Sequence, residues 1–255
     1  MARLLILLQK DLREQIRSSQ LLIAGIMGVF FGILSPLSAR YMPELIALLG
    51  ADQGVQIVLP EPGVIDVLQQ FVSNLSQLGL VVFIVLFMGS ISRENESGTL
   101  DFLMTRPVGP AMILGSKVII AIFVAGAAVI ASALTAVFYA NLLFDGFRAG
   151  LFLYTAGYTF MYLAGAAVVT VCMSAVVRRS FAAGALAFGV LMIVSALGMV
   201  PAIGPFSIGK LNEAAIQAGL GGELLFRPVI GTFVLTGTVF TAAVYRLKRR
   251  ATHAS

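Results

Sequence analysis

Long apolar stretches alternate with short polar segments along the whole chain. Crossing a hydrocarbon core of about 30 Å takes roughly 20 apolar residues in a helix, which satisfies its own backbone polar groups in lipid. The pattern predicts membrane-spanning helices at residues 21–39, 71–91, 114–138, 151–177, 181–201 and 228–245. These runs are too long and too continuously apolar for a β-barrel. We therefore expect an all-α integral membrane protein, with six transmembrane helices in a single domain over residues 1–255.

The first 20 residues predict an amphipathic helix at the membrane surface. Its apolar face, at three-and-four spacing, consists of Leu5, Leu8, Leu12 and Ile16. Such a helix lies in the interface with its cations toward anionic headgroups, so membrane lipids are expected partners. A frayed, solvated start is the alternative. A signal peptide does not fit, because Lys10, Arg13 and Arg17 follow the short apolar run where a cleavage site is needed.

A polar stripe accompanies the start of the second span. Apart from Ser90, purely apolar sequence runs only over residues 78–91, which is too short to cross the membrane, so the span must include polar residues. Their spacing places them on one helix face, which consists of Asp66, Gln69, Gln70, Ser73, Asn74 and Gln77. A polar face is unfavourable against lipid, which leaves two interpretations open: it lines a wet cavity, or it packs against another helix.

Two loops are long enough to carry structure of their own. The loop at 40–70 is broken by prolines and Gly63. The loop at 204–227 contains a helical piece at residues 208–218, bounded by Pro205 and by glycines. This piece either dips back into the membrane or caps the bundle, and the sequence leaves both open.

The distribution of cations predicts the orientation. The chain is 59% hydrophobic and 11% charged, with a net charge of +5. Of its 17 Lys and Arg residues, 13 fall in the N-terminal segment, the 92–117 segment, the turn at 178–179 and the C-terminal tail. By the positive-inside rule these segments, and both termini, are cytoplasmic. The charge is thus an orientation signal, and it gives no reason to expect nucleic acid as a partner.

Residue types that most enzymatic sites need are scarce. The chain has one cysteine, Cys172, and one histidine, His253, so an internal disulfide is excluded. A His-centred catalytic site or a His/Cys metal cluster would have almost no residues available. A phosphate-binding P-loop needs Gly-x-x-x-x-Gly-Lys-Ser/Thr, and the nearest string places a serine between Gly115 and Lys117. We expect no enzymatic activity, no metal and no cofactor in this chain.

The most charged internal segment follows the second span. Residues 93–106 begin with Glu94 and Glu96, and Ser97 is a candidate N-cap for a short helix. The apolar side of that helix would consist of Leu100, Leu103 and Met104. Lys117 opens the third span, where its ammonium can reach the interface. A short helix with an apolar knob among charges suits docking into a groove on a soluble partner, and an ordinary solvated turn is the alternative.

These residues resemble the signature of the type-two permeases of ATP-binding-cassette (ABC) transporters. That signature is an acidic pair, Gly-Thr-Leu, a leucine-rich turn, Pro-Val and a closing Gly-x-Lys. Here it reads Glu94-Asn95-Glu96-Ser97-Gly98-Thr99-Leu100, then Leu103, Pro107-Val108 and Gly115-Ser116-Lys117. The layout is similar as well, with a surface helix, six spans and this segment between the second and third. The chain looks most like the short bacterial permeases of the branch that includes the nitrous-oxide-reductase maturation permease.

The resemblance implies a dimeric permease subunit of a bacterial inner-membrane exporter. Its partners would be a second permease copy and two copies of a separate subunit that binds ATP and Mg²⁺ and hydrolyses ATP. The 93–106 segment would be the coupling helix in a cleft of that ATPase, and Glu94 and Glu96 would contact the ATPase or the N-terminal helix. The implied coupling residues are Glu94, Glu96, Gly98, Thr99, Leu100, Asp101 and Leu103.

Two other functions stay open at this point. The same ATPase-linked architecture could transmit mechanical work to a periplasmic or membrane partner without passing a solute. The other is an ion-gradient-driven secondary transporter or channel. That class would need carboxylates or cations in mid-span, and none of the six predicted spans has one.

Overall fold

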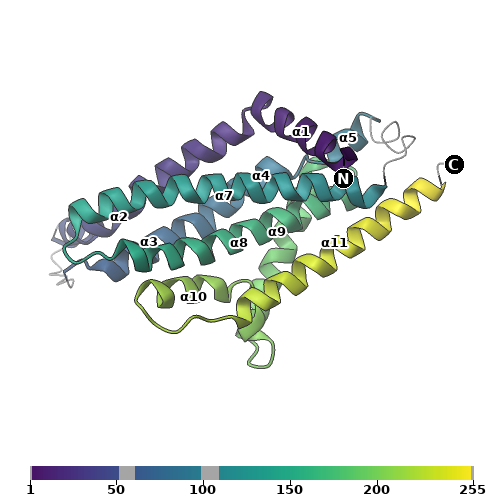
Figure 1. Cartoon of the computed structure of the whole chain (residues 1–255). Helices are drawn as coiled ribbons and strands as arrows, with labels where there is room; N and C mark the ends of the chain where they lie inside the picture. The colour runs from purple at the N-terminus through teal and green to yellow at the C-terminus, as the bar shows by residue number, and fades with distance from the viewer. Residues whose placement is uncertain (1, 52–60, 99–108, 254–255) are drawn as a thin grey trace.

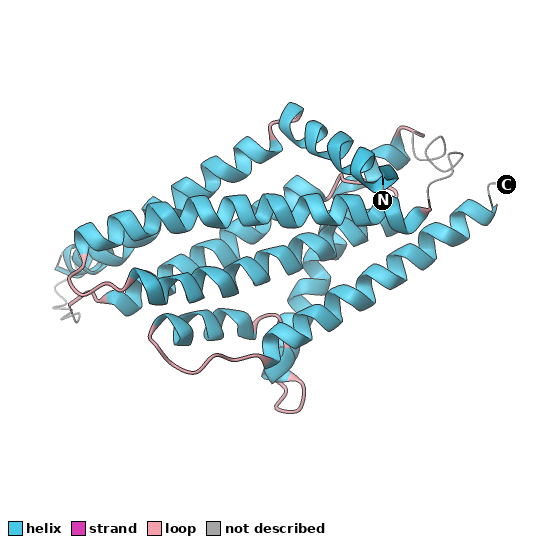
Figure 2. Ribbon diagram, in the orientation of Figure 1, coloured by secondary structure: helices cyan, strands magenta, loops and turns pink. Residues whose placement is uncertain are grey.

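The computed structural model describes residues 2–51, 61–98 and 109–253. This part of the chain consists of helices joined by turns and contains no strand (Figure 2). The elements in chain order are α1 (Ala2–Arg17), α2 (Gln20–Ala51), α3 (Val64–Asn74), the π-helical turn η1 (Leu75–Gly79), α4 (Leu80–Phe87), α5 (Ser92–Glu96), α7 (Pro110–Leu143), α8 (Ala149–Val176), α9 (Ser180–Ala196), the 3-10 turns η2 (Leu197–Met199) and η3 (Gly204–Phe206), α10 (Lys210–Gly219) and α11 (Arg227–His253).

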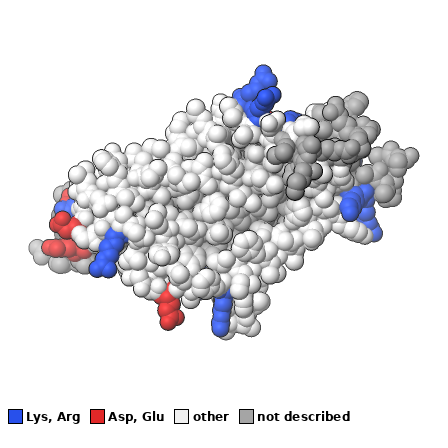
Figure 3. Space-filling view, in the orientation of Figure 1, with Lys and Arg blue, Asp and Glu red and all other residues white. Residues whose placement is uncertain are grey.

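Six helical segments among the described residues are long and apolar enough to cross a membrane. They are Gln20–Ile46, Val64–Glu96, Pro110–Leu143, Ala149–Val176, Ser180–Met199 and Arg227–Arg249. Figure 3 shows charged side chains around the periphery of the face in view, which leaves a broad uncharged middle suited to hydrocarbon. The structure confirms the predicted all-α membrane protein with six transmembrane helices.

The long helices lie side by side, and both chain termini are at one end of the bundle (Figure 1). We name this the terminal end, and the opposite end the distal end. The helix α8 is buried along most of its length and packs against α7, α9, α10 and α11. The chain turns sharply at Ser19, whose φ of 58° lies in the left-handed region. This turn lets α1 fold back and pack against α7 at the terminal end.

The most extensive helix contact joins α2 to α7. Gly28 and Gly32 face α7, and a Cβ atom on either would collide with its backbone, at the carbonyl of Ala128 or of Ser132. Small residues at four-residue spacing let two helix backbones approach closely in a membrane. The two glycines therefore make α2 and α7 a tightly packed pair.

Several helices extend beyond the spans that the sequence predicted. The helix α2 continues past residue 39 to Ala51, although Pro36 and Pro43 lie inside it. Proline removes one backbone hydrogen bond and kinks a helix, but neighbouring helices in a membrane support such a kink. The predicted loop at 40–70 is therefore partly helical, and α11 similarly continues past residue 245 to His253.

The helix α10 occupies the second predicted loop and lies along the distal part of α8 (Figure 1). Its buried face consists of Leu211, Ala214, Ala215 and Ala218. The Thr155 hydroxyl of α8 donates a hydrogen bond to the Ala215 carbonyl at 2.8 Å. The helix thus packs on the side of the bundle, against α8 and α3.

Replacing either glycine of the α2–α7 contact should destabilise the protein. We expect Gly28→Leu and Gly32→Leu each to cost about 1–3 kcal/mol, because α2 must move away from α7. Gly25→Leu is the matched control, since a Cβ atom there meets nothing within 4 Å. Thermal unfolding can be followed by the reaction of a thiol dye with Cys172, which is fully buried in the folded protein. Equal melting temperatures for all three variants would contradict this account.

Candidate functional site

The short helix α5 is fixed to the bundle by the turn that precedes it. The Ser92 hydroxyl donates to the Met88 carbonyl at 2.7 Å, and the Ile91 N–H donates to the hydroxyl of Ser174 on α8 at 3.2 Å. The chain leaves α5 at Gly98, whose φ of 72° lies in the left-handed region that favours glycine. These contacts hold α5 at the terminal end of the bundle.

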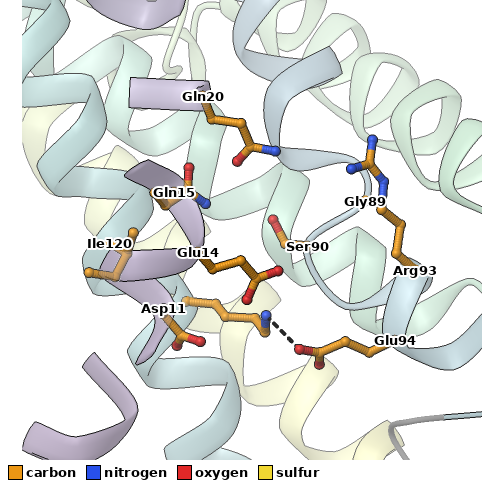
Figure 4. A pocket seen from close by; sticks show the side chains of 10 residues that line it. Asp11, Glu14, Gln15, Gln20, Gly89, Ser90, Arg93, Glu94 and Ile120 are labelled. Atoms are coloured by element: carbon orange, nitrogen blue, oxygen red, sulfur yellow. Dashed lines mark ion pairs between the residues drawn. The ribbon is translucent and has the colours of Figure 1, made fainter. Parts of the chain in front are cut away.

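Glu94 of α5 belongs to an ion cluster between α1 and α7 (Figure 4). Its Oε1 lies 3.0 Å from Nζ of Lys117 on α7 and 3.5 Å from Nζ of Lys10 on α1. Asp11 Oδ1 lies 3.8 Å from the same Lys10 atom, and Asp11 Oδ2 accepts a hydrogen bond from the Ser116 hydroxyl at 2.6 Å. The cluster therefore joins α1, α5 and α7.

Most of this cluster is shielded from solvent. The side chains of Lys117, Glu94 and Asp11 are 8%, 14% and 6% exposed, whereas Lys10 is 47% exposed. A buried ammonium or carboxylate is unfavourable unless it is paired, and removing one partner leaves an uncompensated charge. The Lys117–Glu94 pair is thus the central contact of the cluster, and the exposed Lys10 contributes less.

A polar cavity of about 50 Å³ lies beside the pair (Figure 4). Its lining includes Glu14, Gln15, Ser90, Glu94 and Lys117. Oε2 of Glu94 and Oε1 of Gln15 are buried and have no hydrogen-bond partner among the described residues. The cavity is polar and has room for a water molecule. Water there can hydrogen-bond to Oε2 of Glu94 while Glu94 stays in the ion cluster.

Glu96 of α5 contacts a further helix. Its Oε1 accepts a hydrogen bond at 2.9 Å from the backbone N–H of Ser180, the first residue of α9. A carboxylate at this position satisfies one free N–H of the helix and interacts favourably with the helix dipole. Glu94 and Glu96 therefore bind α5 to α1, α7 and α9.

The structure describes only one of the other predicted coupling residues. Gly98 is described, whereas Thr99, Leu100, Asp101 and Leu103 lie outside the described residues. Ser97 follows the last residue of α5, and its hydroxyl donates to the Glu94 carbonyl at 3.2 Å. The short helix predicted to begin after Ser97 lies outside the described residues.

Two members of the polar stripe bond to other parts of the chain. Asp66 accepts a hydrogen bond from the Gly63 N–H at 2.8 Å and so caps the start of α3. Asn74 donates from its side-chain amide to the Ser35 hydroxyl of α2 at 3.1 Å. Asp66 thus contributes to capping the N-terminus of α3, and Asn74 contributes to the packing of the second span against α2.

The rest of the stripe is less enclosed. The Gln77 amide donates to the Ser73 hydroxyl of the same span at 3.0 Å. Gln69 and Gln77 are exposed on the surface of this chain, and Gln70 and Ser73 are half-buried. The second span thus presents amide groups on an outer surface.

Sequence reasoning did not identify three members of the ion cluster, namely Lys10, Asp11 and Ser116. One signal was available, because Lys117 is a cation at the start of an apolar span and such a charge usually has a partner. A second was Asp11, an acidic residue within a mostly cationic surface helix. Neither signal specifies which helices meet.

Breaking the buried Lys117–Glu94 ion pair should destabilise the protein more than breaking the exposed Lys210–Glu213 ion pair. We expect Lys117→Met to cost about 3 kcal/mol, because Glu94 keeps only the exposed Lys10 as its cation. Adding Glu94→Gln to that variant should restore most of the loss, since both buried charges are then gone. Lys210→Met is the control, as its pair with Glu213 at 2.6 Å is on the surface and should contribute less than about 1 kcal/mol. Melting temperatures measured by Cys172 labelling give the comparison, and equal losses in both single variants would refute it.

Comparison with known proteins gives the family. The sequence matches the family described as ABC-2 family transporter protein over residues 5–249, a range that begins in α1 and ends in α11. It is also 32% identical over 174 residues to the uncharacterized transmembrane protein YxlG of Bacillus subtilis (strain 168), across 66% of this chain and 67% of that protein. With its six candidate spans, the chain is a multi-pass membrane protein that belongs to the ABC-2 family of transporter proteins.

Proposed function

We propose that this chain is the permease subunit of an ABC exporter and works as a dimer in the bacterial inner membrane. Family membership implies an ABC ATPase subunit as its partner. In the proposal two ATPase copies bind ATP and Mg²⁺ and dock on the 93–106 segment of each permease copy. A periplasmic partner, and the branch of the nitrous-oxide-reductase maturation permease, remain predictions of the same kind.

The observation that supports this coupling best is the attachment of α5 to three neighbouring helices. Glu94 pairs with Lys117 of α7 and lies near Lys10 of α1, while Glu96 caps α9. A displacement of the docked segment would therefore move these helices together rather than be lost in a flexible linker. Contacts made in only one nucleotide state of the ATPase would then bias the permease between two conformations.

The charges of the terminal end support its cytoplasmic location. Exposed cations there include Arg13, Arg17, Arg178, Arg179 and Arg246. Cytoplasmic segments close to membrane spans carry an excess of Lys and Arg. On this basis both termini and α5 face the cytoplasm, where the ATPase would be.

We place the transport path next to the polar stripe of the second span. Gln69 and Gln77 are exposed on a segment that crosses the membrane. The Gln77 amide has one bond within the span, and amide groups left without a partner are unfavourable against hydrocarbon. A surface of this kind therefore favours a wet cavity or a second protein copy. A path between two permease copies would place these amides beside water and beside a second copy of the protein.

The coupling proposal is tested by changing the two leucines of the docking segment. We expect Leu100→Asp with Leu103→Asp to abolish co-purification of the ATPase, because a carboxylate cannot enter an apolar cleft unpaired. The matched control is Leu220→Asp with Leu224→Asp, the same change at two exposed positions between α10 and α11. Unchanged ATPase association in the first variant would count against the assignment, provided that both variants insert in the membrane.

The orientation is tested with single cysteines and a membrane-impermeant thiol reagent on intact cells. Glu223→Cys, in the exposed turn after α10, should be labelled from outside. Arg178→Cys, in the exposed turn before α9, should be labelled only after the membrane is opened. The reverse pattern would place α5 on the wrong side for an ATPase.

A further inference from the structure

The second span is not a continuous α-helix. Between α3 and α4 it contains the π-helical turn η1, Leu75–Gly79. The Leu80 N–H at its end bonds to the carbonyls of Leu75 and Gln77. In a regular α-helix this N–H would bond to Ser76, four residues earlier, so the π turn takes away the helical donor of the Ser76 carbonyl.

Tyr162 of α8 supplies a replacement donor. Its hydroxyl donates to the Ser76 carbonyl at 3.3 Å. Tyr162 is 4% exposed and Ser76 is 8% exposed, so little water competes for this bond. A buried carbonyl without a donor is unfavourable, and the tyrosine therefore stabilises the π turn where it stands.

The neighbouring span is irregular beside the same turn. Pro36 in α2 has no N–H, so the Gly32 carbonyl loses its helical donor. The Ser35 hydroxyl donates to the Phe31 carbonyl at 2.7 Å and accepts the amide of Asn74 at 3.1 Å. Because Asn74 directly precedes η1, the two spans are cross-linked where both depart from regular helix geometry.

The two sides of the π turn share the core around α8 but have partly different further neighbours. On the terminal side, α4 leads into α5, which Glu94 and Glu96 bind to α1, α7 and α9. On the distal side, α3 packs on α10, where Leu68 lies close to Gly219. The π turn thus lies between the half of the span that leads to the docking segment and the half that carries the first part of the polar stripe.

We propose that η1 is a swivel in the second span, and that Tyr162 is the positioning residue that sets its resting position. A π turn reverts to regular α-helix when the Leu80 N–H exchanges the Leu75 carbonyl for that of Ser76. This exchange rotates one half of the helix against the other by about 100° at most, the angle of one helical residue. The exposed Gln69 on the distal half would turn relative to α5.

This inference rests on the proposed function, since movement of the ATPase reaches the swivel through α5. The competing interpretation is a static one, in which the π turn merely accommodates one extra residue. The two differ in whether the hydrogen bonds of η1 change when the ATPase changes state. They also differ in whether the Tyr162 hydroxyl controls those bonds specifically.

The first test is hydrogen exchange of the backbone amides at residues 75–81 in the full-length permease in lipid nanodiscs. Tyr162→Phe removes only the hydroxyl and should speed exchange at these amides about fivefold, which corresponds to one hydrogen bond of typical strength. Tyr158→Phe is the matched control, because that neighbouring hydroxyl donates to the Leu225 carbonyl instead, at 3.2 Å. Unchanged exchange in Tyr162→Phe, or an equal change in both variants, would overturn the role of Tyr162.

The second test uses the permease–ATPase complex with and without ATP. Exchange at residues 75–81 should change on ATP addition in the natural chain, and the change should be absent after deletion of Leu78. That exposed residue lies within η1. Its removal takes out one residue, so we expect a continuous α-helix with the flanking contacts in register. Equal exchange with and without ATP in the natural complex would rule out the swivel.

If the deletion variant does not fold, Tyr162→Phe takes its place, and it should enlarge the ATP-dependent change. An unaltered change would again overturn the inference. A failure of the swivel can be told from a failure of the coupling proposal, because the latter is decided by co-purification of the Leu100 and Leu103 variants. The Tyr162 measurement on the permease alone needs no ATPase.

Discussion

The pairing of one buried ammonium with one buried carboxylate holds the terminal end of this protein together. Neither Lys117 nor Glu94 is favourable alone in a low-dielectric setting, so the start of α7 and the helix α5 must be adjacent in the folded chain. The surface helix α1 joins the same site through Asp11 and Ser116. The segment proposed to receive the ATPase is therefore continuous with a rigid contact among helices, and the irregular turn η1 lies farther along the same span.

The hydrophobic pattern predicted the spans well because lipid leaves few alternatives. A run of roughly 20 apolar residues must form a helix there, since every backbone polar group needs a partner within the segment. Asn74 could be included in the second span because the purely apolar run at residues 78–91 is too short to cross the membrane. The end of α2 was predicted too early, because Pro43 ends most helices in water yet only interrupts one supported by neighbours. The π turn was not predicted, since it depends on which carbonyl the Leu80 N–H selects, and no side-chain pattern encodes that choice.

The site could be predicted only in part. Glu94 and Glu96 were identified from their position after a span, but their partners come from three other helices. Asp11 and Ser116 lie near Glu94 and Lys117 only because of the tertiary arrangement of the helices. A single sequence does not specify which helices are neighbours. The close approach at Gly28 was missed for the same reason, since glycines are common in membrane helices and only the facing backbone shows which ones are needed.

The hydrogen bond between Ser116 and Asp11 joins residues 105 positions apart in the sequence. During biosynthesis α1 leaves the ribosome long before α7, so the hydrogen bond from Ser116 to the Asp11 carboxylate cannot form until the third span has been inserted. The N-terminal helix cannot bind α7 during that interval, and its cations and apolar face suit it to a lipid surface. Closure of the ion cluster is consequently a late event of membrane assembly, and a chain halted before α7 would keep its first helix undocked.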